Sequence, residues 1–337
     1  MTAPPASPLD LPPVAAALRA AFADAPVTLV GPVTGGLSGA RLFRLRAEGC
    51  SWLLRLDAGG DMFRDPARWQ PCMRIAAAAG LAPEVRYTDA QHGVSITAFV
   101  EGRTLAAGQQ GPREAMISAL GDLVRRLQAT ELFPPLVDYM DGMAALLDQL
   151  RATGLLAPDA LEAELVGYAQ LDTAYRALRP ELASSHNDLN PRNILQDGAR
   201  LWVVDWESAF LADRYMDLAS LANAVIRDAA ELAVLTQAYF GRPPTTAEAA
   251  RLFLAQQVNH VFYGVMFLLG LTAERPGARI APPASGPELP AIHQALALGQ
   301  FDLESWEGRL SYGVARLRAA RSQLAGPRFA EAVRLAR

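Results

Sequence analysis

SHNDLNPRNIL at residues 185–195 and LWVVDWE at residues 201–207 decide the fold of this chain. The first stretch contains Asp188 and Asn193 in the spacing H-x-D-x4-N. A turn at Asp197-Gly198 then leads into an apolar strand that ends at Asp205. We therefore expect a loop and a short hairpin that deliver two carboxylates and one amide to the same region.

These three side chains suit the transfer of a phosphoryl group. Such transfer needs an acceptor hydroxyl held in line and metal ions that neutralise the triphosphate. A loop carboxylate, here Asp188, can orient the hydroxyl and accept its proton, and the oxygens of Asn193 and Asp205 suit Mg²⁺. The alternative is a polar loop whose Asp and Asn only cap helices.

Short β-like segments precede this stretch and helices surround it. The segments at 27–30, 40–46, 51–56, 84–87 and 94–100 predict a five-stranded antiparallel sheet, with one helix at 66–79. Helices are expected at 9–22, 112–130, 140–153, 158–178, 218–240 with one break, 246–271, 302–324 and 327–336, and an exposed loop at 276–290. The predicted class is α+β, with a small sheet lobe at 1–100 and a large helical lobe at 101–337.

Composition excludes several classes of protein. The net charge of −4 argues against a partner that is nucleic acid, and two cysteines are too few for a disulfide framework. All 31 basic residues are arginine, which excludes a lysine Schiff base and the lysine-dependent P-loop. The N-terminus lacks the pattern of an export signal, and residues 252–271 suit a buried core helix better than a membrane span. We therefore expect a cytoplasmic protein with no membrane partner.

The segment from Ser185 to Glu207 resembles the catalytic and metal-binding segments of the choline kinase and aminoglycoside phosphotransferase superfamily. The resemblance continues through DRYMDLA at residues 213–219 and includes the sheet lobe and a hinge at 97–105. It implies a protein-kinase-like two-lobed fold with ATP between the lobes. It also implies Asp188 as catalytic base and Asn193 and Asp205 as ligands of Mg²⁺.

The nucleotide is expected to contact three places. A glycine-rich segment between the first two strands allows backbone N–H groups to approach phosphates, although such segments are often only hairpin turns. It comprises Gly35, Gly36, Leu37, Ser38 and Gly39. Arg55 takes the position of the strand lysine that grips phosphates in kinase-like folds, unless it is an ordinary surface residue. The backbone of Ala98 and Val100 is expected to receive adenine.

One departure from the family pattern concerns Arg55. In kinase-like folds a glutamate on the next helix holds the strand lysine. Residues 68–80 contain no acid, Asp65 stands at the start of the helix, and Gln70 is the nearest polar substitute. The sequence therefore leaves the partner of Arg55 unassigned.

The acceptor is expected to be the hydroxyl of a small molecule. Asn187 replaces the arginine that binds a phosphorylated activation loop in protein kinases, and only twelve positions separate Asp205 from Asp217. The loop resembles choline, ethanolamine and thiamine kinases, which implies an amino alcohol or related metabolite. Candidate acceptor contacts are Glu207, Asp213, Tyr215 and Tyr263, and Trp206 and Trp306 could add to an aromatic wall for a cation. Aromatic residues at helical spacing are more often core residues.

Asn259, His260 and Tyr263 share one face of a predicted helix and either point into the acceptor cleft or are satisfied polar groups of the core. His186 is expected to brace the loop backbone. The leading interpretation is an ATP- and Mg²⁺-dependent small-molecule kinase. A catalytically weak or inactive nucleotide-binding scaffold on the same fold is the alternative, and a helical interaction module at 302–336 is a third. The sequence leaves the oligomeric state open.

Overall fold

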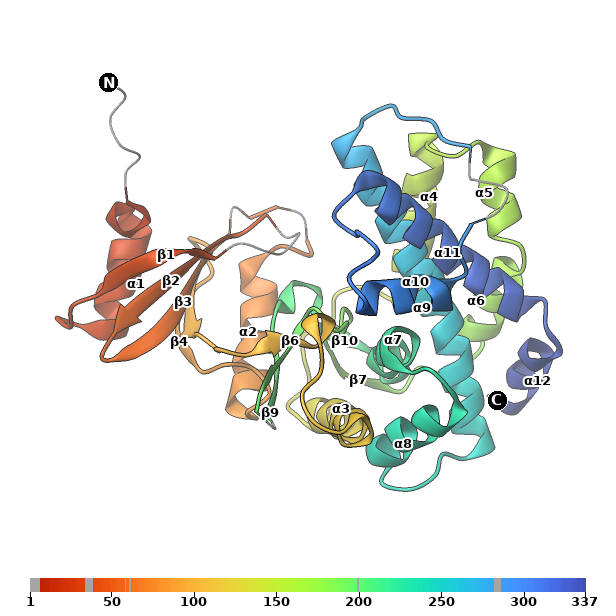
Figure 1. The fold of residues 1–337 in the computed structure, drawn as a ribbon, viewed down its shortest axis with the longest axis horizontal. Helices are drawn as coiled ribbons and strands as arrows, with labels where there is room; N and C mark the ends of the chain where they lie inside the picture. Colours follow the sequence, from red (N-terminus) through yellow and green to blue (C-terminus); the bar gives the residue numbers. More distant parts are fainter. Residues whose placement is uncertain (1–6, 34–38, 58, 61, 199, 282–285) are drawn as a thin grey trace.

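The computed structural model describes residues 7–33, 39–57, 59–60, 62–198, 200–281 and 286–337. A small antiparallel sheet occupies one side of the molecule and helices occupy the other, with short hairpins between them (Figure 1). The predicted α+β class is confirmed. We propose that the lobes divide near residue 100.

The sheet has the strand order β1-β2-β3-β5-β4, and every neighbouring pair is antiparallel. Alternating side chains of these strands are buried, Leu54 and Ile96 completely, because one face packs against α1 (Pro12–Phe22). The strands are β1 (Thr28–Val33), β2 (Arg41–Ala47), β3 (Cys50–Leu56), β4 (Val85–Asp89) and β5 (Val94–Ala98).

Helix α2 (Pro66–Ala78) links the sheet to the helical part. The carboxylate of Asp65 caps its first turn by accepting a hydrogen bond from the Ala67 N–H. The buried side chains of Trp69, Cys72 and Met73 belong to the same hydrophobic core as the C-terminal helices. α2 therefore fixes the sheet against the helical part.

The helical part surrounds α9 (Thr246–Glu274), which contacts α4, α6, α7, α11 and α12. A capping box formed by Thr245 and Glu248 starts this helix. α9 is long and apolar enough to cross a membrane, but 72% of its most apolar window is buried inside the protein. It is a core helix, as the sequence predicted. The other helices are α3 (Arg113–Gln128), α4 (Tyr139–Thr153), α5 (Pro158–Glu164), α6 (Tyr168–Arg176), α7 (Tyr215–Val225), α8 (Ala229–Phe240), α10 (Leu289–Ala297), α11 (Trp306–Leu324) and α12 (Pro327–Leu335).

Some element bounds differ from the prediction. The helix expected at 158–178 is two helices, because Gly167 between α5 and α6 has a φ of +88°. The break expected within 218–240 lies between α7 and α8, where Asp228 caps the second helix. α10 begins inside the segment predicted to be a loop, and α11 begins at Trp306 rather than at 302.

The contact between α9 and α11 depends on a glycine. A Cβ on Gly264 lies 2.6 Å from Leu317 Cδ2 and 3.1 Å from the carbonyl oxygen of Gly313. We expect Gly264→Ala to lower the free energy of unfolding by about 1–3 kcal/mol, because the added methyl overpacks this contact. Gly270→Ala on the same helix meets no atom within 4 Å and is expected to raise stability by up to about 1 kcal/mol. Urea denaturation of both variants checks this, and equal effects would contradict it.

Candidate active site

The loop at residues 186–193, which contains Asp188 and Asn193, lies between two small sheets. β7 (Leu182–Ser185) pairs with β10 (Phe210–Asp213), and β8 (Ile194–Asp197) pairs with β9 (Arg200–Val203) in the hairpin that the sequence predicted. Three strands were not predicted from the sequence: β7, β10 and the two-residue β6 (Arg103–Thr104), which pairs with β8. These strands fix both ends of the loop at residues 186–193.

Asp188 and Asn193 are in direct contact within this loop. The Asn193 Nδ2 donates to Asp188 Oδ2 and to the Asp188 carbonyl oxygen, each at 2.9 Å. Asp188 Oδ1 accepts from Asn190 Nδ2 at 3.0 Å and from the Tyr263 hydroxyl at 2.6 Å. Burial raises the pKa of Asp188, and these hydrogen bonds oppose that shift. A carboxylate of raised basicity suits a group that accepts a proton.

Asp217 holds the loop backbone from α7. Its two carboxylate oxygens accept from the N–H groups of His186 and Asn187, at 2.7 and 2.8 Å. His186 Nε2 lies 3.1 Å from the Val204 carbonyl oxygen, so this histidine braces the loop against the strand segment before Asp205. Asp217 belongs to the sequence motif DRYMDLA, but no role was predicted for it. The signal was available, since a buried acid needs partners and a loop offers N–H groups.

Asp205 lies two residues after the end of β9 and adopts a left-handed conformation, with φ +65° and ψ 69°. The preceding residue, Val204, donates its N–H to the Asn193 carbonyl oxygen at 3.0 Å, which places Asp205 beside the loop. The charge of Asp205 also contributes to the raised pKa of Asp188. A left-handed non-glycine residue carries strain of the kind that gathers at functional sites.

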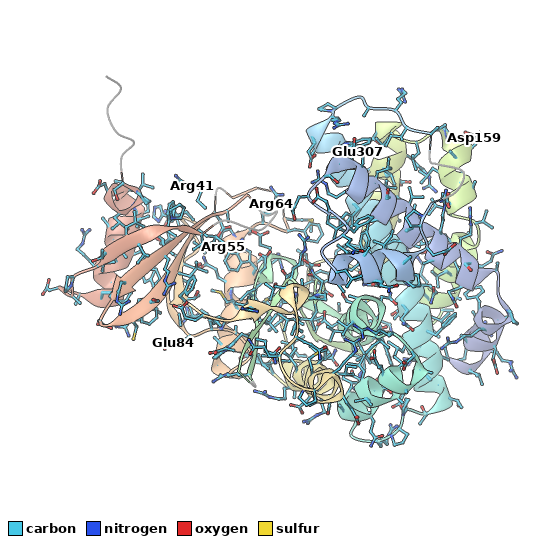
Figure 2. All side chains as sticks on the ribbon, viewed as in Figure 1. Arg41, Arg55, Arg64, Glu84, Asp159 and Glu307 are labelled. Atoms are coloured by element: carbon cyan, nitrogen blue, oxygen red, sulfur yellow. The ribbon has the colours of Figure 1, made fainter. Side chains whose placement is uncertain are left out.

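Arg55 binds three carboxylates. Its Nε lies 3.0 Å from Asp57 Oδ1, its Nη1 lies 3.1 Å from Asp205 Oδ1, and its Nη2 contacts the carboxylate of Glu207. Its guanidinium also lies over the ring of Trp69 on α2, 5.0 Å from the ring centroid, on the part of the sheet nearest α2 (Figure 2). The unassigned partner of Arg55 is therefore not a helix acid. Asp57 was detectable from sequence, because residues i and i+2 of a strand share a face.

The predicted nucleotide contacts are only partly described. Residues 35–38 of the glycine-rich segment lie outside the described residues, and Gly39 has a φ of +73° between β1 and β2. The Ala98 N–H donates to the Glu84 carbonyl oxygen at 2.8 Å. Among the described residues no hydrogen bond occupies the N–H of Val100, whereas that of Ala98 is occupied.

The four candidate acceptor residues lie in different surroundings. Tyr263 touches Asp188 directly, whereas Glu207 pairs with Arg55. Asp213 accepts from the Tyr175 hydroxyl at 3.0 Å. Tyr215 is buried, and the charges of Glu181, Arg214 and Arg251 act on it. Within the described chain, no hydrogen bond or ion pair joins Asp213 or Tyr215 to the loop around Asp188.

Asp213 should make stability depend on pH. Burial raises the pKa of Asp213 from 3.8 to about 6, although hydrogen bonds to the Tyr215 N–H and the Tyr175 hydroxyl oppose this. The folded protein then keeps a proton that the unfolded chain loses, so this contribution is present below pH 4 and is lost as pH rises through 6. We expect the stability of the wild type relative to Asp213→Asn to fall by about 2 kcal/mol between pH 4 and 7.

Urea denaturation at several pH values measures this difference. The exposed Asp159, labelled in Figure 2, provides the control, and Asp159→Asn should show no such trend. A constant difference between wild type and Asp213→Asn would contradict the prediction.

The donor set around Asp205 fits a magnesium ion. Asn193 Nδ2 is committed to Asp188, and no hydrogen bond within the described part of the chain takes its Oδ1. Asp205, Asp57 and Glu207 place three carboxyl groups against the single charge of Arg55, and burial raises the pKa of Glu207 to about 7. Among the described residues no three His, Cys, Asp or Glu side chains are grouped as a closed metal site. Mg²⁺ bound with a triphosphate needs only one or two protein oxygens.

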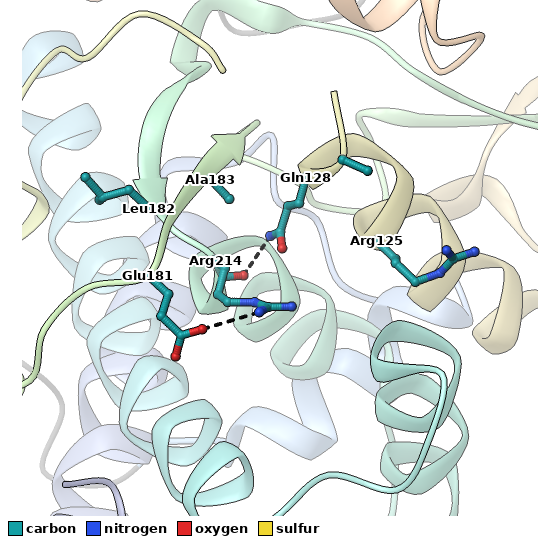
Figure 3. Close-up of a pocket in the computed structure, with 7 residues that line it drawn as sticks. Arg125, Gln128, Glu181, Leu182, Ala183 and Arg214 are labelled. Carbon is teal, nitrogen blue, oxygen red and sulfur yellow. Dashed lines mark hydrogen bonds and ion pairs between the residues drawn. The ribbon is translucent and has the colours of Figure 1, made fainter. Parts of the chain in front are cut away.

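A separate surface pocket lies at the other end of β7 from Asp188. It has a volume of about 360 Å³ and is lined by Arg125, Gln128, Glu181 and Arg214, among others (Figure 3). The Arg214 guanidinium pairs with Glu181, and the Arg214 carbonyl oxygen accepts from Gln128. The charges of this pocket are already paired, so it carries none of the chemistry of the loop.

A small antiparallel sheet, a helical part and a braced acidic loop between them define a kinase-like phosphotransferase fold. The sequence model of the phosphotransferase enzyme family matches residues 30–253, which is more than half of the chain. The chain belongs to this family.

Individual relatives are more distant. Over 149 residues the chain is 27% identical to protein LicA of Haemophilus influenzae, a match that spans 42% of this chain and 54% of LicA, about half its length. The fold is similar to a choline/ethanolamine kinase family protein from Mesorhizobium loti, with a TM-score of 0.68, 22% identity and coverage of 98% and 96% of the two chains. It is also similar to a spectinomycin phosphotransferase solved with ADP and spectinomycin, with a TM-score of 0.53, 12% identity and coverage of 88% and 93%.

Proposed function

We propose that this protein transfers the γ-phosphoryl group of ATP, with Mg²⁺, to a hydroxyl group of a small molecule, an amino alcohol or a related metabolite. The observation that carries the proposal is the direct contact of Asp188 with Asn193, beside Asp205 and Arg55. Names of the similar proteins support the acceptor class, and the relative solved with ADP supports the nucleotide. A cytoplasmic location fits this activity.

Each residue has a proposed part in the reaction. Asp188 orients the acceptor hydroxyl and takes its proton while the hydroxyl oxygen bonds to the γ-phosphorus and the bond to the β-phosphate oxygen breaks, which releases ADP. Asn193 and Asp205 would hold Mg²⁺, which would supply positive charge to offset that of the phosphates. Arg55 contacts phosphate oxygens, together with the backbone of residues 35–39. Val100, with Ala98, contacts the adenine.

The ion pairs of Arg55 have a consequence for binding. Arg55 neutralises part of the acidic cluster of Asp57, Asp205 and Glu207 when no nucleotide is present. Asp205 would hold Mg²⁺ when the metal and ATP are bound, and the guanidinium of Arg55 would then be available to the phosphates. Binding of the two is therefore expected to be coupled.

The alternative is a nucleotide-binding scaffold on the same fold, and the arginine at position 55 favours it. Two measurements separate the functions: the thermal shift with ATP in the presence and absence of Mg²⁺, and ADP release with amino alcohols, thiamine, sugars and aminoglycosides. An enzyme binds ATP and releases ADP with at least one acceptor. Binding without release under every acceptor supports the scaffold, and no binding excludes both.

A further inference from the structure

Arg316 on α11 is a buried cation without a carboxylate partner among the described residues. Its side chain is 2% exposed. Its Nη1 lies 3.1 Å from His260 Nδ1, and its Nη2 lies 3.5 Å from Asn259 Oδ1. Its Nε is buried and has no hydrogen-bond partner. Arginine stays charged in proteins, so this position holds a full positive charge in a poorly solvated place.

The groups around Arg316 do not neutralise it. Because arginine only donates, His260 must accept through Nδ1 and is the neutral tautomer. Burial, and then the charge of Arg316, lower the pKa of His293 to about 4, and the same two causes lower the pKa of His260. The rings of Tyr263 and Tyr312 lie on the guanidinium, with centroids 4.8 and 5.5 Å from Cζ. All of these neighbours are uncharged.

Arg316 lies one side chain away from the proposed base. The ring of Tyr263 contacts Arg316, and its hydroxyl donates to Asp188 at 2.6 Å. An acceptor whose hydroxyl lies at Asp188 therefore places its remaining atoms near Tyr263. His260, Tyr263 and Tyr312 are each 8–9% exposed, so a small part of each residue that encloses the guanidinium faces solvent.

The same residues are unsuited to a cationic acceptor. A cation needs free aromatic faces, yet Tyr263 and Tyr312 already contact the Arg316 guanidinium. Of the other aromatic candidates, Trp306 lies under Arg275 and Trp206 packs against His186. A second positive charge beside Arg316 would be repelled.

We infer that the acceptor is a small hydroxy acid whose carboxylate is recognised by Arg316 while its hydroxyl lies at Asp188. The carboxylate supplies the missing negative charge and accepts from the unpaired N–H groups. This inference rests on the proposed phosphoryl transfer to a hydroxyl group, and it replaces the amino alcohol with an acidic metabolite as the acceptor. It differs from the choline and ethanolamine named for the structurally similar proteins.

A mixture of metabolites separated by charge tests the inference, because the charge of the acceptor is the property that it specifies. Small metabolites from a cell extract are treated with phosphatase and divided on an anion exchanger into an acidic and an unretained fraction. Each is incubated with the protein, Mg²⁺ and γ-labelled ATP, and label on an organic product is measured. We expect label in the acidic fraction. Label only in the unretained fraction, or loss of acceptor activity on phosphatase treatment, would overturn the inference.

A variant links the result to Arg316. Arg316→Met is expected to lower transfer to the acidic fraction by about 100-fold or more, because the site then lacks the group that pairs with the carboxylate. ATP affinity should stay unchanged. Arg321→Met, which alters a partly exposed arginine of the same helix that pairs with Glu164, is the control. An equal loss for acidic and uncharged acceptors would assign Arg316 a merely structural role.

Two outcomes distinguish failure of the proposed function from failure of the hydroxy-acid inference. If neither fraction is labelled and no ADP forms, the proposed function itself is wrong, and the inference falls with it. If the unretained fraction alone is labelled, the proposed function stands and the hydroxy acid is excluded. Thermal unfolding would reveal whether Arg316→Met fails to fold. In that case the inference is still tested by incubating the two metabolite fractions with the wild-type protein and comparing their labelling.

Discussion

Replacing Asp188 by asparagine is expected to lower the rate of phosphoryl transfer by about 10²–10⁴-fold while ATP binding persists. Asparagine preserves the size of the side chain but cannot take the proton of the acceptor hydroxyl. Asp188 accepts hydrogen bonds from Asn193 and Tyr263 through its side-chain oxygens. The variant therefore also tests whether these oxygens position the hydroxyl of the acceptor. Single-turnover transfer and equilibrium ATP binding measure the two effects separately.

Asp197→Asn is the matched control for this substitution. Asp197 is an exposed residue of β8 in the same hairpin, and its replacement should leave transfer unchanged. If Asp188→Asn keeps wild-type turnover, Asp188 is not the base. If it abolishes ATP binding as well, the loss reflects disruption of the loop rather than of proton transfer, and thermal unfolding will show it.

Replacing Asp205 by alanine is expected to lower transfer by about 10²–10³-fold, the size of effect seen when one group that stabilises transition-state charge is removed. The Mg²⁺ concentration needed for half-maximal rate should rise, because a carboxylate ligand is lost. Activity titrated with Mg²⁺ at saturating ATP measures both quantities. Unchanged magnesium dependence would contradict the assignment of Asp205.

Glu207→Gln distinguishes the effect of losing a metal ligand from the effect of losing an ion-pair partner of Arg55. Both Asp205 and Glu207 pair with Arg55, so either substitution removes one partner of the guanidinium. Of these two carboxylates, only that of Asp205 is proposed to hold Mg²⁺. We therefore expect Glu207→Gln to change the magnesium requirement much less than Asp205→Ala does. Equal changes would indicate that the loss of an Arg55 partner explains both.

The part of the site that is local in sequence was predictable. Asp188, Asn193 and Asp205 belong to one loop and one hairpin, whose turn at Asp197-Gly198 forces the two strands together. The sheet was also predictable, because the alternation of apolar residues along each strand is local in sequence. Helix breaks were harder, because Gly167 interrupts apolar spacing that continues on both of its sides.

The parts that depend on distant packing were not predictable. Arg316 is unremarkable in sequence, and only the packing of α11 on α9 brings it beside Tyr263. The aromatic residues suggested a site for a cation, but sequence does not show that arginines of the protein already occupy those rings. The partner of Arg55 was missed because the family pattern directed attention to the next helix instead of to Asp57.

The central claim is that Asn193 and Asp205 hold a divalent ion on the nucleotide beside Asp188. Electron paramagnetic resonance of Mn²⁺ tests it most directly, with a non-hydrolysable ATP analogue and the wild type, Asn193→Ala and Asp205→Ala. We expect the wild type to bind Mn²⁺ together with the nucleotide, and each variant to bind it at least about tenfold more weakly. Equal Mn²⁺ affinity in all three proteins would contradict the claim.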